Sequence, residues 1–135
     1  MKVIVIDGQG GNIGKQLVKS IKDNFDDVYV RAIGTNSTAT SNMLKGGADE
    51  AATGQNAVVV GCNVADVIVG PIGIIIPDAL LGEVTPVMAQ AVSQSKAEKV
   101  LIPLNKCDVL VAGVSDKSTA ELLDDAIKML HDIIK

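Results

Sequence analysis

A run of glycines near the start of the chain has the residue types and spacing that can hold a phosphate group. The run, Gly8–Gly14, follows the apolar segment Val3–Ile6 and precedes a segment with helical periodicity. A glycine turn between a strand and a helix presents backbone amides at the positive end of the helix dipole, where anions bind. The sequence therefore predicts a phosphate or nucleotide site at Gly8–Gly14, with the carboxyl group of Asp7 beside it.

The spacing of these glycines also carries a resemblance to a known family. Gly8, Gly11 and Gly14 form the pattern GxxGxxG, and the stricter GxGxxG is absent. The loop resembles the NAD(P)-binding Rossmann loop of extended and atypical short-chain dehydrogenases, which implies a nicotinamide cofactor. The Tyr-x-x-x-Lys pair of that family is missing, because Tyr29 is the only tyrosine and Ile33 stands where the lysine would be. No catalytic set is therefore predicted.

The residues after the second predicted strand bear on the choice of cofactor. NAD-binding proteins place an acidic residue there to bind the ribose hydroxyls. Residues 28–48 contain no acidic residue and offer Thr35, Asn36 and Ser37 at a predicted helix start. Hydroxyl and amide groups suit a phosphate, so NADP is favoured over NAD, with Arg31 as a further phosphate ligand if it lies near the strand end. Ordinary helix capping by the same residues remains an alternative.

Two other readings of the function stay open. The first is an enzyme that acts on a phosphorylated metabolite through Asp7 or the turn Asn105–Cys107. Asn105–Asp108 resembles the guanine-reading motif of P-loop GTPases, but the matching phosphate loop GxxxxGK[ST] is absent, so we interpret it as a turn. The second is a non-catalytic structural dimer whose glycine loop is empty.

Composition narrows the class of protein. The 135 residues predict a single domain, and 47% of them are hydrophobic while only 1% are aromatic. A net charge of −4 and the lack of aromatic stacking platforms argue against nucleic-acid binding. No apolar run is long enough for a membrane span, and the short apolar start is too brief for a signal peptide. We expect a cytoplasmic protein in which Cys62 and Cys107 are buried thiols.

Hydrophobic periodicity predicts alternating strands and helices. The expected strands are Val3–Ile6, Val28–Ile33, Asp66–Gly70, Val100–Leu104 and Val109–Val114. The expected helices are Asn12–Lys22, Ser37–Lys45 with Ser37 as its cap, a helix from Thr85-Pro86 to Ser95, and a final helix opened by a capping box of Ser118 and Glu121. Asn56–Ala65 fits either type and is assigned to helix, whereas Asp49–Gln55 is expected to be a loop.

These elements predict an α/β three-layer sandwich with a mostly parallel, Rossmann-like sheet of order 2-1-3-4-5. Only Asn105–Asp108 separate the last two strands, too few for a parallel crossover, so the last strand is expected to be antiparallel. Ligands of such sheets bind at the carboxyl edge, where the chain order reverses. The predicted site is Asp7, Gly8, Gln9, Gly10, Gly11, Asn12, Ile13, Gly14, Thr35, Asn36, Ser37, Gly70, Pro71, Ile72 and Gly73.

The apolar segment Pro71–Pro77 is unusual, because its prolines and glycine argue against a central strand. Its side chains must still be covered, either as the wall of a pocket or as a contact with another subunit. The second option, and the high apolar content, predict a homo-oligomer.

The whole chain resembles a small bacterial family known only as a domain of unknown function. The segments that carry this resemblance are Val5–Gly11, Gly34–Asn36, Ala52–Gly54, Gly70–Ile76 and Ile102–Cys107. The resemblance implies a self-contained domain and supplies no activity, substrate or catalytic residue.

Overall fold

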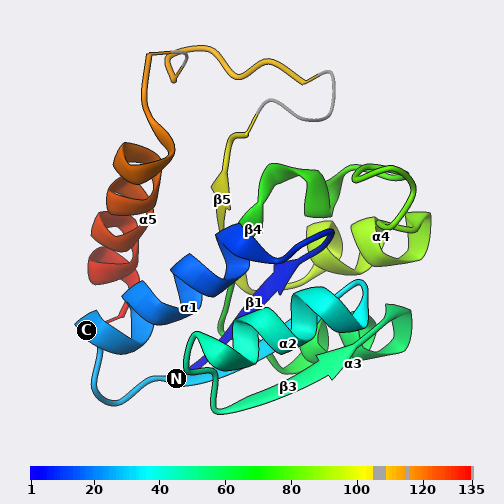
Figure 1. Cartoon of the computed structure of the whole chain (residues 1–135), viewed down its shortest axis with the longest axis horizontal. Coiled ribbons are helices and arrows are strands. Elements are labelled where there is room, and N and C mark those ends of the chain that lie inside the picture. Colours follow the sequence, from blue (N-terminus) through cyan, green and yellow to red (C-terminus); the bar gives the residue numbers. More distant parts are fainter. Residues whose placement is uncertain (105–108, 115, 135) are drawn as a thin grey trace.

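A parallel five-stranded sheet forms the centre of the molecule. The computed structural model describes residues 1–104, 109–114 and 116–134. Its strands are β1 (Lys2–Asp7), β2 (Tyr29–Gly34), β3 (Glu50–Thr53), β4 (Val67–Pro71) and β5 (Glu98–Ile102). Its helices are α1 (Asn12–Asn24), α2 (Ser37–Lys45), α3 (Gln55–Val64), α4 (Pro86–Gln94) and α5 (Thr119–Ile133), with a short 3-10 helix η1 (Ile72–Ile75). The sheet order is β3-β2-β1-β4-β5, and every paired strand is parallel (Figure 1).

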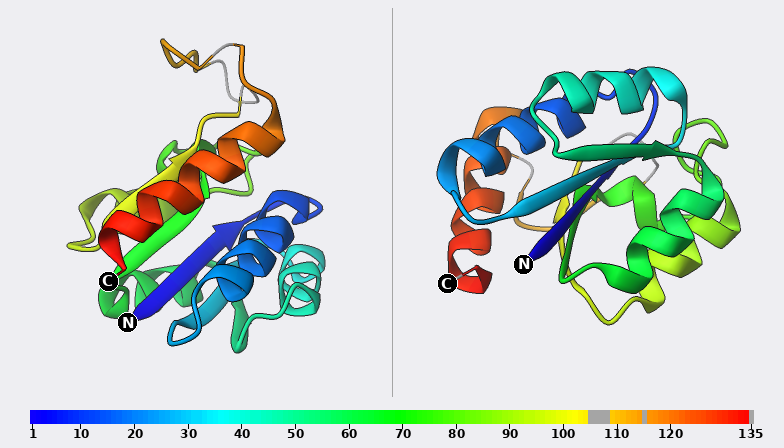
Figure 2. Two further views of the ribbon diagram at one scale, coloured as in Figure 1. Left: turned by 90° about the vertical axis from the view of Figure 1, so that its left-hand side faces the viewer. Right: turned by 90° about the horizontal axis from the view of Figure 1, so that it is seen from below.

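Helices cover both faces of this sheet, which gives the expected three layers (Figure 2). Alternate side chains of β1 point to opposite faces, as the strand period of two requires. Val3 and Val5 pack under α1, α2 and α5, whereas Ile4 and Ile6 pack against α3 and α4. The core is almost entirely aliphatic, in keeping with a sheet that is buried on both faces.

The topology corrects two expectations. Glu50–Thr53, expected as a loop, is edge strand β3 beside β2. Its alanines have little strand propensity and stay half-buried, so periodicity gives no signal there. The expected antiparallel strand Val109–Val114 forms no strand, because this segment turns at Gly113 (φ 89°) and leaves Leu110 86% exposed. The other four strands lie in the expected order, with the switch point between β1 and β4.

Local signals placed the helices well. The ambiguous segment is helix α3, α4 begins after Thr85 as cap with Pro86 at its first position, and Ser118 forms the expected capping box with Glu121. The cap of α2 is corrected: Asn36, and not Ser37, accepts the hydrogen bond from the Ala39 amide. In the part of the chain that the structure describes, no helix has the length and apolarity to span a membrane.

Candidate functional site

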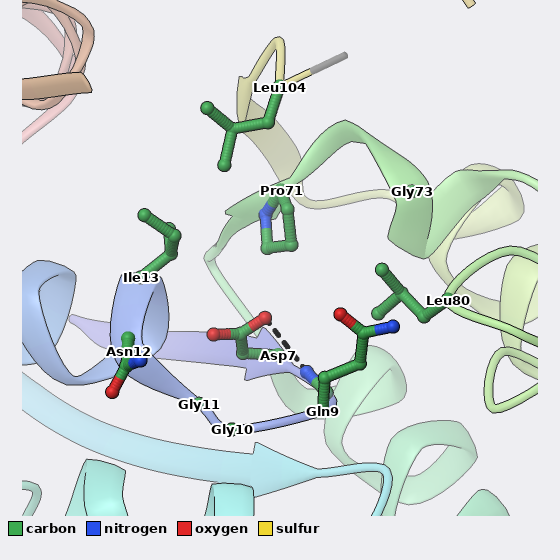
Figure 3. A pocket seen from close by; sticks show the side chains of 11 residues that line it. Asp7, Gln9, Gly10, Gly11, Asn12, Ile13, Pro71, Gly73, Leu80 and Leu104 are labelled. Atoms are coloured by element: carbon green, nitrogen blue, oxygen red, sulfur yellow. Dashed lines mark hydrogen bonds between the residues drawn. The ribbon is translucent and has the colours of Figure 1, made fainter. Parts of the chain in front are cut away.

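A small cavity lies at the carboxyl edge of the sheet, at the switch point between β1 and β4. It encloses about 100 Å³ and is lined by Asp7, Gly8, Gln9, Gly10, Gly11, Asn12, Ile13, Pro71, Gly73, Leu80 and Leu104. The side chains of Asp7 and Gln9 extend toward it, and Ile13, Pro71, Leu80 and Leu104 surround it with apolar groups (Figure 3). The cavity is smaller than the ~300–1,000 Å³ of typical ligand pockets, so as it stands it has room for one small group such as a phosphate.

The glycine loop is held from inside by the carboxylate of Asp7. Asp7 ends β1 and is 5% exposed. Its Oδ1 accepts from the Gly8 amide at 2.8 Å (Figure 3), and its Oδ2 accepts from the Gly14 amide at 2.7 Å. Gly14 lies in the first turn of α1, so the Asp7 carboxylate serves as a long-range cap for this helix. The structure therefore gives Asp7 a role in building the loop.

The three glycines of the GxxGxxG pattern are each required by packing within the protein. A Cβ at Gly8 would lie 2.6 Å from Thr35 Oγ1, one at Gly11 would lie 2.6 Å from Ala39 Cα, and one at Gly14 would lie 2.5 Å from Met43 Sδ. Gly11 also has a φ of 73°. Gly10 differs, because a Cβ there would meet nothing closer than Asn12 Nδ2 at 3.7 Å. The glycine spacing is thus explained by close packing within the protein: Gly11 and Gly14 lie against α2, and Gly8 lies against Thr35, Leu80 and Glu83.

A second carboxylate, that of Glu83, reaches the loop from a distant part of the sequence. Its Oε1 accepts from the Gln9 amide at 2.8 Å, from Thr35 Oγ1 at 2.7 Å and from Asn36 Nδ2 at 2.7 Å. Burial acts to raise the pKa of Glu83, but these three hydrogen bonds outweigh it and hold the pKa below its usual value. Glu83 is therefore a charged group fixed at the carboxyl end of β2.

This carboxylate removes the structural basis for the expected NADP preference. Thr35 and Asn36, the residues assigned to a 2′-phosphate, both donate to Glu83, so a negative charge stands where that phosphate would bind. Ser37 is exposed at the start of α2. Arg31 pairs with Glu50 at 2.6 Å and lies within β2, away from its carboxyl end. The structure does not support a preference for NADP.

The backbone amides of the loop divide into two groups. Those of Gly8, Gln9, Gly11 and Gly14 donate to the Asp7 and Glu83 carboxylates and the Gly8 carbonyl oxygen. Among the described residues, the amides of Gly10, Asn12 and Ile13 donate no hydrogen bond. The loop is thus less open to an anion than the sequence predicts, and three amides remain for a ligand.

The structure brings together most of the predicted site but not all of it. Pro71 and Gly73 line the cavity. Part of the apolar segment Pro71–Pro77 therefore forms the wall of a pocket, which was one of the two alternatives that the sequence left open. Gly70 is packed under the Ile6 carbonyl oxygen, and Ile72 lines a groove against α5 on another side of η1. The motif at Asn105–Asp108, including Cys107, lies outside the described residues. Sequence reasoning missed Leu80, Glu83 and Leu104 as parts of this region.

The Cys62 thiol and the His131 imidazole belong to residues that do not line the cavity. Cys62 is buried in α3, and burial raises the pKa of its thiol to about 11. The His131 ring packs on Phe25 with 4.6 Å between the ring centres. Within residues 1–104, 109–114 and 116–134, no group of three or more histidine, cysteine or acidic side chains is arranged to hold a metal ion.

Comparison with known proteins identifies the family. No curated protein matches the chain. One solved structure that the chain matches is described as a dodecameric FMN-dependent UbiX-like decarboxylase from Escherichia coli O157:H7. The match has 13% sequence identity and a TM-score of 0.47, and it covers 98% of this chain and 92% of that structure's chain. A family model described as a domain of unknown function matches residues 2–135. The chain therefore belongs to the family of domains of unknown function DUF3842.

Proposed function

We propose that this domain binds a small phosphorylated ligand, of the nucleotide class, at the cavity between β1 and β4. The observation that carries the proposal is that Gly10, Asn12 and Ile13 line the cavity and that their amides donate no hydrogen bond to another described residue. They stand at the start of α1, where the helix dipole favours an anion. The phosphate would rest on these amides, and Gln9 would contact it from the side.

The shape of the cavity supports a ligand that is part polar and part apolar. Ile13, Pro71, Leu80 and Leu104 offer an apolar wall to a sugar or base that follows the phosphate. The Asp7 carboxylate adds a negative charge near the phosphate and reduces its affinity. We therefore expect moderate binding, governed by the backbone amides.

The contacts of Asp7 weigh against the alternative of an enzyme that uses it as a nucleophile. Both of its carboxylate oxygens accept hydrogen bonds from the loop, and the side chain is 5% exposed. A carboxylate held in this way has little freedom to attack a substrate. A ligand-free homo-oligomer remains the other alternative; it predicts a melting temperature that depends on protein concentration and on no phosphate compound.

Thermal unfolding with a ligand panel tests the proposal. The probes are orthophosphate, ATP, GTP, NAD and NADP, each over a range of concentrations. A ligand at 100 times its Kd should stabilise the folded protein by about 2.7 kcal/mol. We expect stabilisation by at least one nucleotide, with NADP no better than NAD. Absence of stabilisation by every probe would contradict the proposal.

The variant Asn12→Asp separates binding from stability. Asn12 is exposed at the first position of α1, whose first turn has no acidic residue. A carboxylate there should leave the unliganded stability unchanged or raise it by up to about 1 kcal/mol. The same charge should weaken phosphate binding by about 1 kcal/mol or more. Gln90→Glu, on the exposed side of α4, is the matched control for net charge and should change neither quantity.

A further inference from the structure

The segment Asp78–Glu83, which we name the strap, joins η1 to α4 and lies against the glycine loop. Two backbone hydrogen bonds join the two ends of the strap, from the Asp78 amide to the Val84 carbonyl oxygen at 2.7 Å and from the Val84 amide to the Ala79 carbonyl oxygen at 3.1 Å. Two of its side chains touch the site: Leu80 lines the cavity, and Glu83 accepts from three donors. Because its two ends are hydrogen-bonded to each other, the strap can move without unfolding the helices on either side.

The strap is held in a costly backbone conformation. Asp78, Leu80 and Leu81 have φ values of 66°, 57° and 57°, in the left-handed region that leucine rarely adopts. Leu81 is in addition 96% exposed, so no burial offsets its conformation. Such a backbone persists only where other contacts hold it. The contacts that hold this strap to the loop are those of Leu80 and Glu83.

The three donors under Glu83 form a set that suits any anion. The Gln9 amide comes from the glycine loop, and the Thr35 hydroxyl and Asn36 amide group come from the end of β2. Gln9 directly precedes Gly10, whose amide belongs to the proposed phosphate site. A ligand with two linked phosphates could therefore place one on the Gly10, Asn12 and Ile13 amides and the other on the donors that Glu83 now occupies.

We propose that Glu83 is an internal competitor of the ligand: its carboxylate occupies a second anion subsite, and a diphosphate-bearing ligand displaces it and opens the strap. The inference rests on the proposed function, because it assumes that the first phosphate binds at the neighbouring amides. Displacement exposes the Glu83 carboxylate to water, releases the left-handed leucines and enlarges the small cavity toward β2. A diphosphate would thus gain the contacts of the second subsite but lose the work of opening the strap, a cost that a monophosphate at the first subsite does not meet.

The test compares orthophosphate and pyrophosphate on the wild type and four variants by calorimetric titration. Glu83→Ala removes the competitor, and Glu83→Gln keeps its shape without its charge. We expect pyrophosphate to bind Glu83→Ala roughly tenfold more tightly than wild type, because displacing the Glu83 carboxylate should cost a net free energy of about one hydrogen bond to a charged group. Glu83→Gln should bind pyrophosphate more tightly than wild type by a smaller factor. Orthophosphate affinity should stay within about twofold in both. Glu98→Gln, at the opposite end of the sheet, is the matched control for charge.

A change in the opposite direction makes the test sharper. Asparagine adopts the left-handed region more easily than leucine, so Leu81→Asn should favour the closed strap. It should weaken pyrophosphate binding roughly fivefold and leave orthophosphate unchanged. Hydrogen exchange adds a second readout, since saturating pyrophosphate should slow exchange in Gly8–Gly14 and speed it in the strap.

The outcomes separate this inference from the proposed function. If orthophosphate binds but the Glu83 variants leave pyrophosphate affinity unchanged, or raise both affinities equally, the competitor is overturned and the phosphate site stands. If pyrophosphate binds the Glu83 variants more tightly than wild type while orthophosphate binds none, Glu83 does occupy an anion site, but the three-amide site and the placement of two linked phosphates are overturned. If neither compound binds wild type or any variant, both proposals fail.

Discussion

Room for a side chain decides which glycines of the β1–α1 loop can change. Gly11 combines a φ of 73° with an Ala39 backbone that a Cβ would approach to 2.6 Å. Gly10, next to it, has no left-handed φ and no close neighbour. The two adjacent glycines therefore differ: Gly11 lets α1 approach α2, whereas Gly10 lines the cavity and is not required by packing.

The pair Gly11→Ala and Gly10→Ala tests this difference at the scale of single residues. Gly11→Ala should lower the free energy of unfolding by about 2 kcal/mol or more, because strain and overpacking add. Gly10→Ala should change it by less than about 0.5 kcal/mol. Urea unfolding followed by circular dichroism measures both. Equal stabilities of the two variants would show that the loop relaxes around Gly11. A charged substitution at Gly11 is a poor test of ligand binding, because it confounds binding with folding.

At the scale of elements, Asn36 links three parts of the molecule. Its Oδ1 caps α2 by accepting from the Ala39 amide, and its Nδ2 donates to the Gln9 carbonyl oxygen and to Glu83. The glycine loop is also held by Asn42 of α2, whose Nδ2 donates to the Gly10 carbonyl oxygen. The loop is therefore fixed by β1, α2 and the strap together, which keeps its amides in place before a ligand arrives.

Comparing the stability losses of Asn36→Ala and Ser118→Ala separates the capping role of Asn36 from its hydrogen bonds to the glycine loop and the strap. Ser118 caps α5 through its capping box with Glu121 and is not among the residues that line the cavity. Ser118→Ala should cost about 1 kcal/mol of stability, the usual value of a lost cap. Asn36→Ala should cost about 2–3 kcal/mol, because it also breaks a hydrogen bond to a charged group. Similar losses in urea unfolding of the two variants would contradict the linking role of Asn36.

At the scale of the whole molecule, the site exists because parallel strands end at one edge of the sheet. The chain leaves β1 toward the α1 face and leaves β4 toward the α4 face, so a crevice opens between the two strands (Figure 1). The cavity lies in this crevice, and Leu80 of the strap forms part of its wall.

Folding stability should depend on pH through carboxylates spread over the molecule. Burial acts to raise the pKa of Asp49, but hydrogen bonds from Lys22 and the Val30 amide lower it overall, and the Glu83 pKa is likewise lowered. A carboxyl group whose pKa is lower in the folded state stabilises the protein above its unfolded pKa of about 4 and loses that contribution as the pH falls through its folded pKa.

We therefore expect the free energy of unfolding to be nearly constant from about pH 7 to pH 5 and to fall below about pH 4. Urea midpoints across this range measure it. Asp49→Asn should flatten part of the acid decline, since it removes one of the groups that titrate. A decline that begins well above pH 5, or an unchanged slope in this variant, would contradict the assignment to these carboxylates.

The sequence by itself determined the features that depend on near neighbours along the chain. Hydrophobic period, caps and turns gave the helices, four of the five strands and their order, and they placed the glycine loop at the switch point. Only the tertiary structure decided which loop amides are already bonded. Gln9 and Thr35 both donate to Glu83, which lies 74 positions after Gln9 and 48 positions after Thr35. The Asp7 carboxylate accepts from the Gly14 amide. Periodicity carries no information about such contacts, because they form only when the sheet brings distant loops to one edge.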